Sequence, residues 1–137
     1  MTLKDTAMEF FDACETGKGW DACARYCATG ATFSAQAGAL GDVTTLEAYT
    51  EWMKGLLVPL PDGRYELMSV GVDEERGSVC IAATFHGTHT VDAGGNPPTG
   101  KSVASEYAYV IRLKGDKITH MTKIWNDVYA VQALGWA

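Results

Sequence analysis

The fold is decided by residues 101–113, which read KSVASEYAYVIRL. Alternate positions of this stretch share one face: Val103, Ser105, Tyr107, Tyr109 and Ile111. A period of two predicts a strand with one buried face. Further strands are predicted at Tyr65–Val72, Ser78–Val91 and Ile118–Val128, separated by short turns rich in charged residues and glycine. Long strands that follow one another directly predict an antiparallel sheet.

The spacing of apolar residues predicts that the first half of the chain is mainly helical. Apolar residues recur at helical spacing in residues 3–14, Trp20–Ala28 and residues 44–57. Thr2 followed by Asp5 resembles a capping box for the first of these segments. Helices followed by strands predict one α+β domain over residues 1–137, with the helices on one face of the sheet.

Charge and cysteine content narrow the function classes. The chain has 17 acidic and 11 basic residues, and a net charge of −6 disfavours nucleic acid as a partner. The four cysteines lack zinc-site spacing, so we expect no metal, and they are typical of free thiols in a reducing compartment. No secretion signal, no apolar run of about 20 residues and no phosphate-binding glycine loop is found. These features predict a cytoplasmic protein without membrane span or nucleotide cofactor.

Four motifs in the second half resemble one known family. They are Gly87-Thr-His-Thr90, Gly95-Asn-Pro-Pro-Thr-Gly-Lys101, Arg112-Leu-Lys-Gly-Asp-Lys-Ile118, and Asn126-Asp127 with Gln132-Ala-Leu-Gly135. Their order and spacing resemble those of SnoaL-like proteins of the NTF2-like superfamily. The resemblance implies a cystatin-like cone, in which a curved antiparallel sheet wraps around N-terminal helices and leaves an internal pocket. Relatives include polyketide cyclases, ketosteroid isomerases, dehydratases and epoxide hydrolases, and others only bind ligands or dimerise, so the fold does not fix the function.

The chain departs from that family at its catalytic positions. The position of the cyclase acid/base Asp is occupied by Lys123, and that of its partner His by Tyr109. A more widespread family Asp falls at Asn126, with Asp127 one step further, and a one-residue bulge would bring Asp127 into its place. The ketosteroid isomerase base falls near Ala35. The resemblance therefore implies a candidate catalytic set of Tyr109, Lys123, Asn126 and Asp127.

Each candidate has a chemical and a structural interpretation. Lys123 in an apolar pocket would be a base or a Schiff-base nucleophile, and without burial it is a solvated lysine. Asp127 would be a general acid/base, or would pair with Lys123 or Arg112. The hydroxyls of Tyr107 and Tyr109 would polarise a ketone, or both rings belong to the core.

The pocket walls are predicted from apolar stripes and from the resemblance. The expected lining residues are Tyr49, Trp52, Met53, His89, Tyr107, Met121 and Trp125. His86 and His89 lie three apart in a strand-like segment, so they face opposite sides and make no metal pair. We expect His86 and His120 to be partly exposed.

Three functions remain open. The first is a cofactor-free enzyme of cyclase, isomerase or hydratase type that acts on a small apolar carbonyl or polyketide-like compound. The second is a non-catalytic binding or carrier module for a small apolar ligand. The third is a dimerising interaction domain whose cavity is filled by its own side chains. We also expect a homodimer that uses the outer sheet face, including Ala108, Val110, Arg112 and Ile124.

Overall fold

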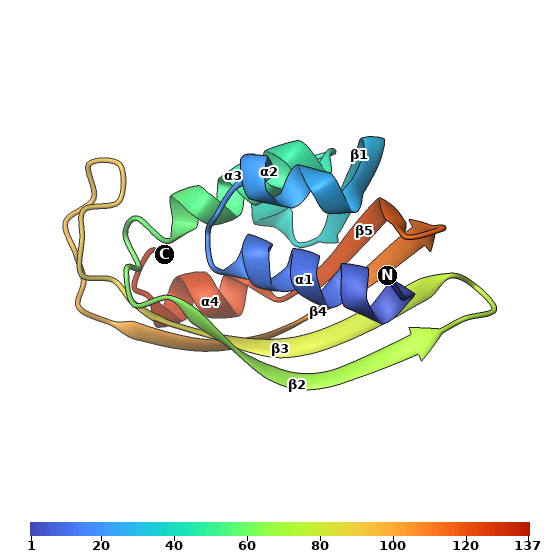
Figure 1. Cartoon of the computed structure of the whole chain (residues 1–137). Helices are drawn as coiled ribbons and strands as arrows, with labels where there is room; N and C mark the ends of the chain where they lie inside the picture. The colour runs from blue at the N-terminus through green and yellow to red at the C-terminus, as the bar shows by residue number, and fades with distance from the viewer.

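The computed structural model describes residues 1–137 and shows a curved five-stranded sheet with helices along its concave side (Figure 1). The strands are β1 (Cys27–Gln36), β2 (Arg64–Asp73), β3 (Ser78–Thr88), β4 (Ser102–Lys114) and β5 (Lys117–Trp125). Their order is β1-β5-β4-β3-β2. The helices are α1 (Leu3–Glu15), α2 (Trp20–Cys23), η1 (Ala24–Tyr26), η2 (Gly38–Leu40), α3 (Leu46–Leu56) and α4 (Asp127–Ala133). The predicted α+β class is confirmed.

The predicted alternation of β4 is confirmed residue by residue. Its odd-numbered side chains from 103 to 113 are buried, and its remaining side chains are half-buried or exposed. β4 pairs antiparallel with β3 and with β5, so Tyr109 lies between Ile81 and Lys123. Side chains directly across a ladder share a face of the sheet, and Lys123 is therefore directed inward together with Tyr109.

Helix α1 provides the first layer over the sheet. Its capping box is present, because Thr2 and Asp5 exchange side-chain and backbone hydrogen bonds at 3.0 and 3.1 Å. Phe10, Phe11 and Cys14 are completely buried on its inner face. One helical turn beyond Phe11, that same face carries Glu15.

The N-terminal half differs from the prediction at β1. The helix expected over Trp20–Ala28 ends at Tyr26, and Cys27 begins a ten-residue strand. This strand pairs parallel with β5, so the sheet is mixed at one edge and antiparallel elsewhere. The strand was missed because its cysteine, alanines and glycine carry little strand propensity, although Ala31 and Phe33 show the alternating burial.

The C-terminal end also differs from the prediction. The last strand ends at Trp125 rather than at Val128, and α4 occupies what was expected to be strand end and tail. Asn126 caps this helix by accepting a hydrogen bond from the Tyr129 backbone N–H at 3.1 Å. A bulge near Asn126 would have brought Asp127 into its place, but the irregularity in the β4–β5 pairing lies at Arg112–Leu113, at the other end of the strand pair.

No helix of the structure is long and apolar enough to cross a membrane. The core consists of the inner sheet face, α1 and α3, and it continues to Ala130 and Leu134 of the C-terminal segment. That arrangement leaves the pocket between β4, β5, α3 and α4.

Candidate functional site

A continuous chain of buried polar side chains lies at the centre of the molecule. Lys123 Nζ donates to the Tyr49 hydroxyl at 2.9 Å, and that hydroxyl makes a short hydrogen bond with the hydroxyl of Tyr109. The Tyr109 hydroxyl donates to Glu15 Oε2 at 2.8 Å, and the Tyr107 hydroxyl donates to Glu15 Oε1 at 2.5 Å. All five side chains are at most 5% exposed. The chain connects a buried amine to a buried carboxylate through phenols.

Four different elements place these groups together. Glu15 is the last residue of α1, Tyr49 lies on α3, and the other three lie on the inner faces of β4 and β5. The register opposes Tyr109 to Lys123 directly. A shift of one residue in β5 would turn Lys123 to the outer face, so the chain of hydrogen-bonded side chains depends on this pairing.

Burial dominates the electrostatics of the site. It raises the pKa of Glu15, while the Lys123 charge and the two phenol hydrogen bonds act in the opposite direction. Burial also lowers the pKa of Lys123 to about 8, and the Glu15 charge opposes that shift. Burial, with Glu15 next, raises the pKa of Tyr49, Tyr107 and Tyr109, so these phenols stay protonated and serve as donors. A base and an acid are thus held in one apolar site with their pKa values moved toward neutrality.

Aromatic rings surround the amine of Lys123. Its Nζ lies 4.4 Å from the ring centroid of Trp125, 5.1 Å from that of Tyr107 and 5.2 Å from that of Tyr49. The rings of Trp52 and Tyr109 lie at 5.3 and 5.7 Å. Ring quadrupoles attract a cation at these distances, which compensates part of the cost of burying the ammonium.

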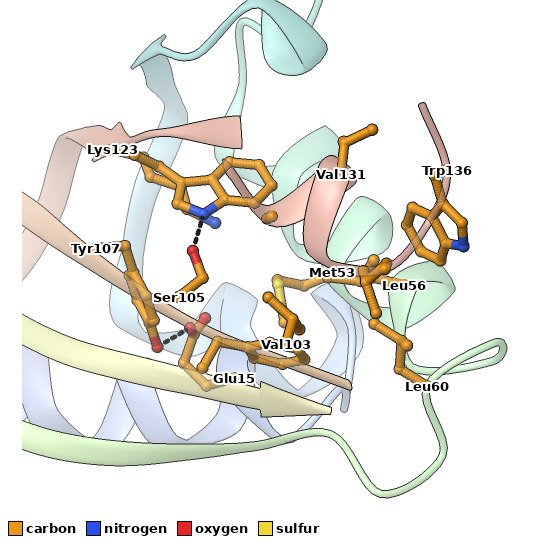
Figure 2. A pocket seen from close by; sticks show the side chains of 14 residues that line it. Glu15, Met53, Leu56, Leu60, Val103, Ser105, Tyr107, Lys123, Val131 and Trp136 are labelled. Atoms are coloured by element: carbon orange, nitrogen blue, oxygen red, sulfur yellow. Dashed lines mark hydrogen bonds between the residues drawn. The ribbon is translucent and has the colours of Figure 1, made fainter. Parts of the chain in front are cut away.

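An apolar pocket opens next to the chain of hydrogen-bonded side chains. Eleven of its fourteen lining residues are hydrophobic, and the polar ones are Glu15, Ser105 and Lys123. Figure 2 shows Glu15, Tyr107, Ser105 and Lys123 at one end, with Leu60 and Trp136 at the other. The volume open to the centres of water-sized molecules is about 40 Å³, so the pocket is narrow.

The C-terminal segment closes the apolar end. Gly135 has a φ of +73°, and the backbone N–H groups of Gly135 and Trp136 bond to Gln132 and Val131 in a Schellman motif. Glycine adopts this left-handed conformation without a steric cost. The turn directs Trp136 back onto the pocket, where it lines the wall together with Val131.

Ser105 lies on the pocket wall and is oriented by a neighbour. Trp125 Nε1 donates to Ser105 Oγ at 2.8 Å (Figure 2). Ser105 is 2% exposed, and its oxygen is used as an acceptor, so its own hydroxyl hydrogen stays available to a ligand in the pocket.

The predicted pocket residues divide into three groups. Met53, Tyr107 and Trp125 line the pocket. Tyr49 and Trp52 stand behind the wall, Tyr49 through its bond to Lys123 and Trp52 through an edge-to-face contact with Trp125. The other two lie elsewhere: Met121 is completely buried in the core, and His89 is completely buried behind Trp136.

The four predicted catalytic residues do not come together. Lys123 and Tyr109 belong to the buried chain, whereas Asn126 and Asp127 lie outside the pocket lining. Asn126 is exposed and caps α4, and Asp127 accepts a hydrogen bond from the Ala39 backbone N–H at 2.8 Å. The expected placement of Asn126 and Asp127 on the last strand, deep in the pocket, is therefore wrong, because the strand ends at Trp125, before both of them.

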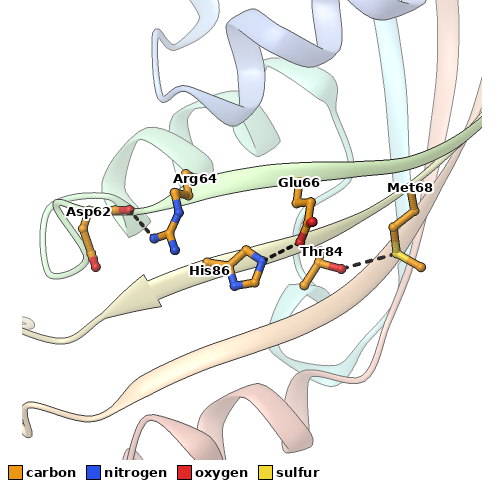
Figure 3. Close-up of polar contacts among 6 residues, drawn as sticks. All are labelled: Asp62, Arg64, Glu66, Met68, Thr84 and His86. Atoms are coloured by element: carbon orange, nitrogen blue, oxygen red, sulfur yellow. Dashed lines mark hydrogen bonds and ion pairs between the residues drawn. The ribbon is translucent and has the colours of Figure 1, made fainter.

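The other two histidines lie on the outer sheet face. His86 Nε2 contacts Glu66 Oε1 at 3.0 Å, next to Arg64 and the Thr84–Met68 contact (Figure 3). His120 bonds to Thr32, Ser34 and Thr122, and its pKa is lowered by partial burial and by Arg112. Both are half-buried, as expected.

Glu15 is the principal residue that sequence reasoning missed. The available signal was its place four residues after Phe11 on the apolar face of α1, where a carboxylate is unexpected. Ser105 and Trp136 were also missed as pocket residues. No group of three or more His, Cys, Asp or Glu side chains converges in a way that could hold a metal ion.

Comparisons with known proteins agree with this fold. The sequence profile of one family, SnoaL-like polyketide cyclase, matches residues 5–134. No curated protein matches the chain. Among solved structures, IdmH from Streptomyces antibioticus, a proposed polyketide cyclase, is similar at 18% identity with a TM-score of 0.79, covering 98% of this chain and 99% of that one.

Two further structures are similar over most of their length. A proposed SnoaL-like polyketide cyclase from Jannaschia sp. CCS1 has 18% identity and a TM-score of 0.79, with 98% of this chain and 92% of that chain covered. A protein of ketosteroid isomerase-like fold from Catenulispora acidiphila, solved with trimethylamine, has 18% identity and a TM-score of 0.72, with 98% and 95% covered. At this identity the structures show the shared fold.

Proposed function

Because this chain belongs to the SnoaL-like polyketide cyclase family, we propose that it is a cofactor-free enzyme that moves a proton at the carbon next to a carbonyl group. The observation that carries the proposal is the pairing of Glu15 and Lys123 at the polar end of one apolar pocket. Cyclisations and isomerisations of carbonyl compounds need a base for the carbon-bound proton and a positive group for the oxygen.

In the proposed reaction Glu15 is the base. Burial raises its pKa, which makes the carboxylate a stronger base than an exposed glutamate. Lys123, in its ammonium form, stabilises the negative oxygen of the enolate, and the Ser105 hydroxyl donates a second hydrogen bond. Tyr107 and Tyr109 hold the carboxylate in place through its two oxygens. The proton returns from Glu15 to carbon, so no external acid is consumed.

The residues that line the pocket indicate the substrate class. Eleven hydrophobic lining residues favour a small apolar skeleton around the reactive carbonyl. The similarity to proposed polyketide cyclases supports a polyketide-like compound as the natural substrate.

The test follows proton exchange rather than an unknown product. Cyclopentanone is incubated with the protein in D2O, and loss of the α-proton signal is followed by NMR. Removal of a general acid or base costs about 10²- to 10⁴-fold, so Glu15→Gln and Lys123→Met should lose most of the exchange. Glu106→Gln and Lys114→Met, at exposed positions of β4, are the matched controls. Exchange at the buffer rate, with ketone binding shown by a thermal shift, would contradict the proposal.

The second candidate is a non-catalytic binding module. It is favoured by the small free volume of about 40 Å³, which leaves little room for a reacting substrate. Tight binding of apolar carbonyl compounds without exchange would support it instead.

Two further expectations belong to the same proposal. The four cysteines, of which Cys14 and Cys23 are buried, support a reducing, cytoplasmic location, because they are typical of small hydrophobic residues with free thiols. Exposed apolar residues on the outer sheet face, such as Met68 and Ile124, support a homodimer.

A further inference from the structure

We propose that Lys123 forms a covalent imine with aldehydes and small ketones that enter the pocket, so that the protein activates its carbonyl substrate through a Schiff base. The inference deepens the proposed function and rests on the same pocket. It begins with the position of the amine, which lies on the pocket wall at the end of β5 and is 4% exposed.

The hydrogen bonding of Lys123 leaves its nitrogen free to react. Its single hydrogen bond to protein is the one donated to Tyr49 at 2.9 Å. A neutral amine has two N–H groups and a lone pair, so this bond fixes one N–H and leaves the lone pair available. No carboxylate contacts the nitrogen directly, because Glu15 is separated from it by the phenols of Tyr49 and Tyr109.

The population of neutral amine supports the same chemistry. With a pKa of about 8, roughly one tenth of Lys123 is neutral at pH 7. An exposed lysine of ordinary pKa is neutral in about one molecule in 2,500. Lys123 is therefore the lysine most ready to attack a carbonyl carbon, provided that the carbonyl reaches it.

The reaction balances without an oxidant or a cofactor. The Lys123 lone pair attacks the carbonyl carbon, the C=O pair moves to oxygen, and one nitrogen proton passes to that oxygen to give a carbinolamine. Its hydroxyl then takes a proton and leaves as water while the C=N bond forms. The sum is amine plus carbonyl to imine plus water, and the Tyr49–Tyr109–Glu15 chain supplies a path for the protons.

The surroundings favour the covalent state. A protonated imine keeps the positive charge on the nitrogen, so the rings of Trp125, Tyr107 and Tyr49 attract it as they attract the ammonium. The iminium also acidifies the adjacent carbon, and Glu15 lines the same pocket to take that proton. In this route the iminium takes the place that the Lys123 ammonium and the carbonyl oxygen have in the direct reaction, so transfer of the α-proton to Glu15 gives an enamine instead of an enolate.

The test traps the imine on the wild-type protein. Propanal, which is small enough for the narrow pocket, is added at pH 7 with sodium cyanoborohydride, and the propylated sites are mapped by peptide mass spectrometry over time. We expect Lys123 to be labelled at least about tenfold faster than the exposed Lys114. Labelling of Lys123 no faster than of Lys114 would overturn the inference. The α-amine of Met1 is mapped separately.

Variants sharpen the result. Lys123→Arg keeps the charge but forms no imine under these conditions, so the fast adduct should vanish, whereas Lys114→Arg should keep it. If Lys123→Arg does not fold, the wild-type map alone decides. Exchange of cyclopentanone protons without any Lys123 adduct overturns the imine and leaves the proton-transfer function standing. A fast Lys123 adduct without exchange supports the imine and contradicts the proposed catalysis.

Discussion

His89 Nδ1 accepts two hydrogen bonds, one from Trp136 Nε1 at 3.0 Å and one from the Thr99 backbone N–H at 3.1 Å. An acceptor nitrogen carries no proton, so in neutral His89 the ring proton is on Nε2, which is buried without a partner. The imidazole thereby joins the C-terminal segment to the loop after β3. Trp136 is held against the pocket by this contact.

Replacing His89 should loosen the pocket mouth. In His89→Phe the N–H groups of Trp136 and Thr99 lose their acceptor, and we expect a loss of about 1–3 kcal/mol in the free energy of unfolding. Urea denaturation measures this loss, and acrylamide quenching of tryptophan fluorescence should increase.

His86→Phe is the matched control, because it removes only one hydrogen bond, to Glu66 on the outer sheet face. Its effect should stay within about 1 kcal/mol. Equal stability and quenching in the two variants would show that His89 does not hold the segment.

The two phenols bonded to Glu15 should control its acidity. Each hydrogen bond favours the carboxylate, so Tyr107→Phe and Tyr109→Phe should raise the pKa of Glu15 further above its ordinary range. Titration of the ¹³C-labelled glutamate carboxyl by NMR measures the shift. Tyr129→Phe, at an exposed position of α4, should leave it unchanged. A Glu15 pKa that falls in either variant would contradict donation from these phenols to the carboxylate.

Lys123 should make stability depend on alkaline pH. Its folded pKa is about 8 and its ordinary value is 10.5, so between these values the unfolded chain binds more protons. Unfolding free energy therefore rises with pH in this window, by up to about 1.4 kcal/mol per unit from this group. The burial cost of the charge is fully present below pH 8.

The comparison with Lys123→Met isolates this contribution. Tyrosines and cysteines with raised pKa values lower the stability of both proteins at high pH, and their effect largely cancels in the difference. We expect the unfolding free energy of the wild type minus that of Lys123→Met, both measured by urea denaturation, to increase from pH 8 to 10. A flat difference would show that the Lys123 pKa is not lowered.

The sheet and half of the site could be predicted because strand patterns are local. Alternation in residues 101–113 was sufficient to place Tyr107 and Tyr109 inside, and the short turn after Lys114 set the pairing that brings Lys123 beside Tyr109. Because side chains alternate between the two faces of a strand, one correct pairing register fixes the face of every side chain on that strand.

Glu15 could not be placed in the site because its partners are distant in the chain. Its burial depends on Tyr107 and Tyr109, more than ninety residues away, which supply the hydrogen bonds that a carboxylate needs inside. The end of β5 was missed for a local reason: Asn126 follows Ile124 and Trp125 directly, and an asparagine there fits either a strand end or a helix cap.

Asn126 should behave as a cap and not as a catalytic group. Asn126→Ala removes the acceptor for the Tyr129 N–H and should cost about 1 kcal/mol of unfolding free energy. Proton exchange of cyclopentanone should remain at the wild-type rate at temperatures where the variant is folded. Asn126→Asp retains a capping oxygen and should recover the stability, which separates capping from chemistry. Loss of exchange in Asn126→Ala with unchanged stability would assign the residue to the reaction instead.

The outer sheet face should carry the dimer. Ile124 is 50% exposed on β5 and pairs with Ala108, while Met68, 53% exposed on β2, contacts Thr84 on the same outer face. Ile124→Lys places a charge in this apolar region and should convert the dimer to a monomer in light scattering at micromolar concentration. Since Ile124 is outside the core, its replacement should change the intrinsic stability by no more than about 0.5 kcal/mol. Val128→Lys alters an equally exposed apolar residue on α4 and should stay dimeric, whereas a wild-type monomer under the same conditions would exclude the dimer altogether.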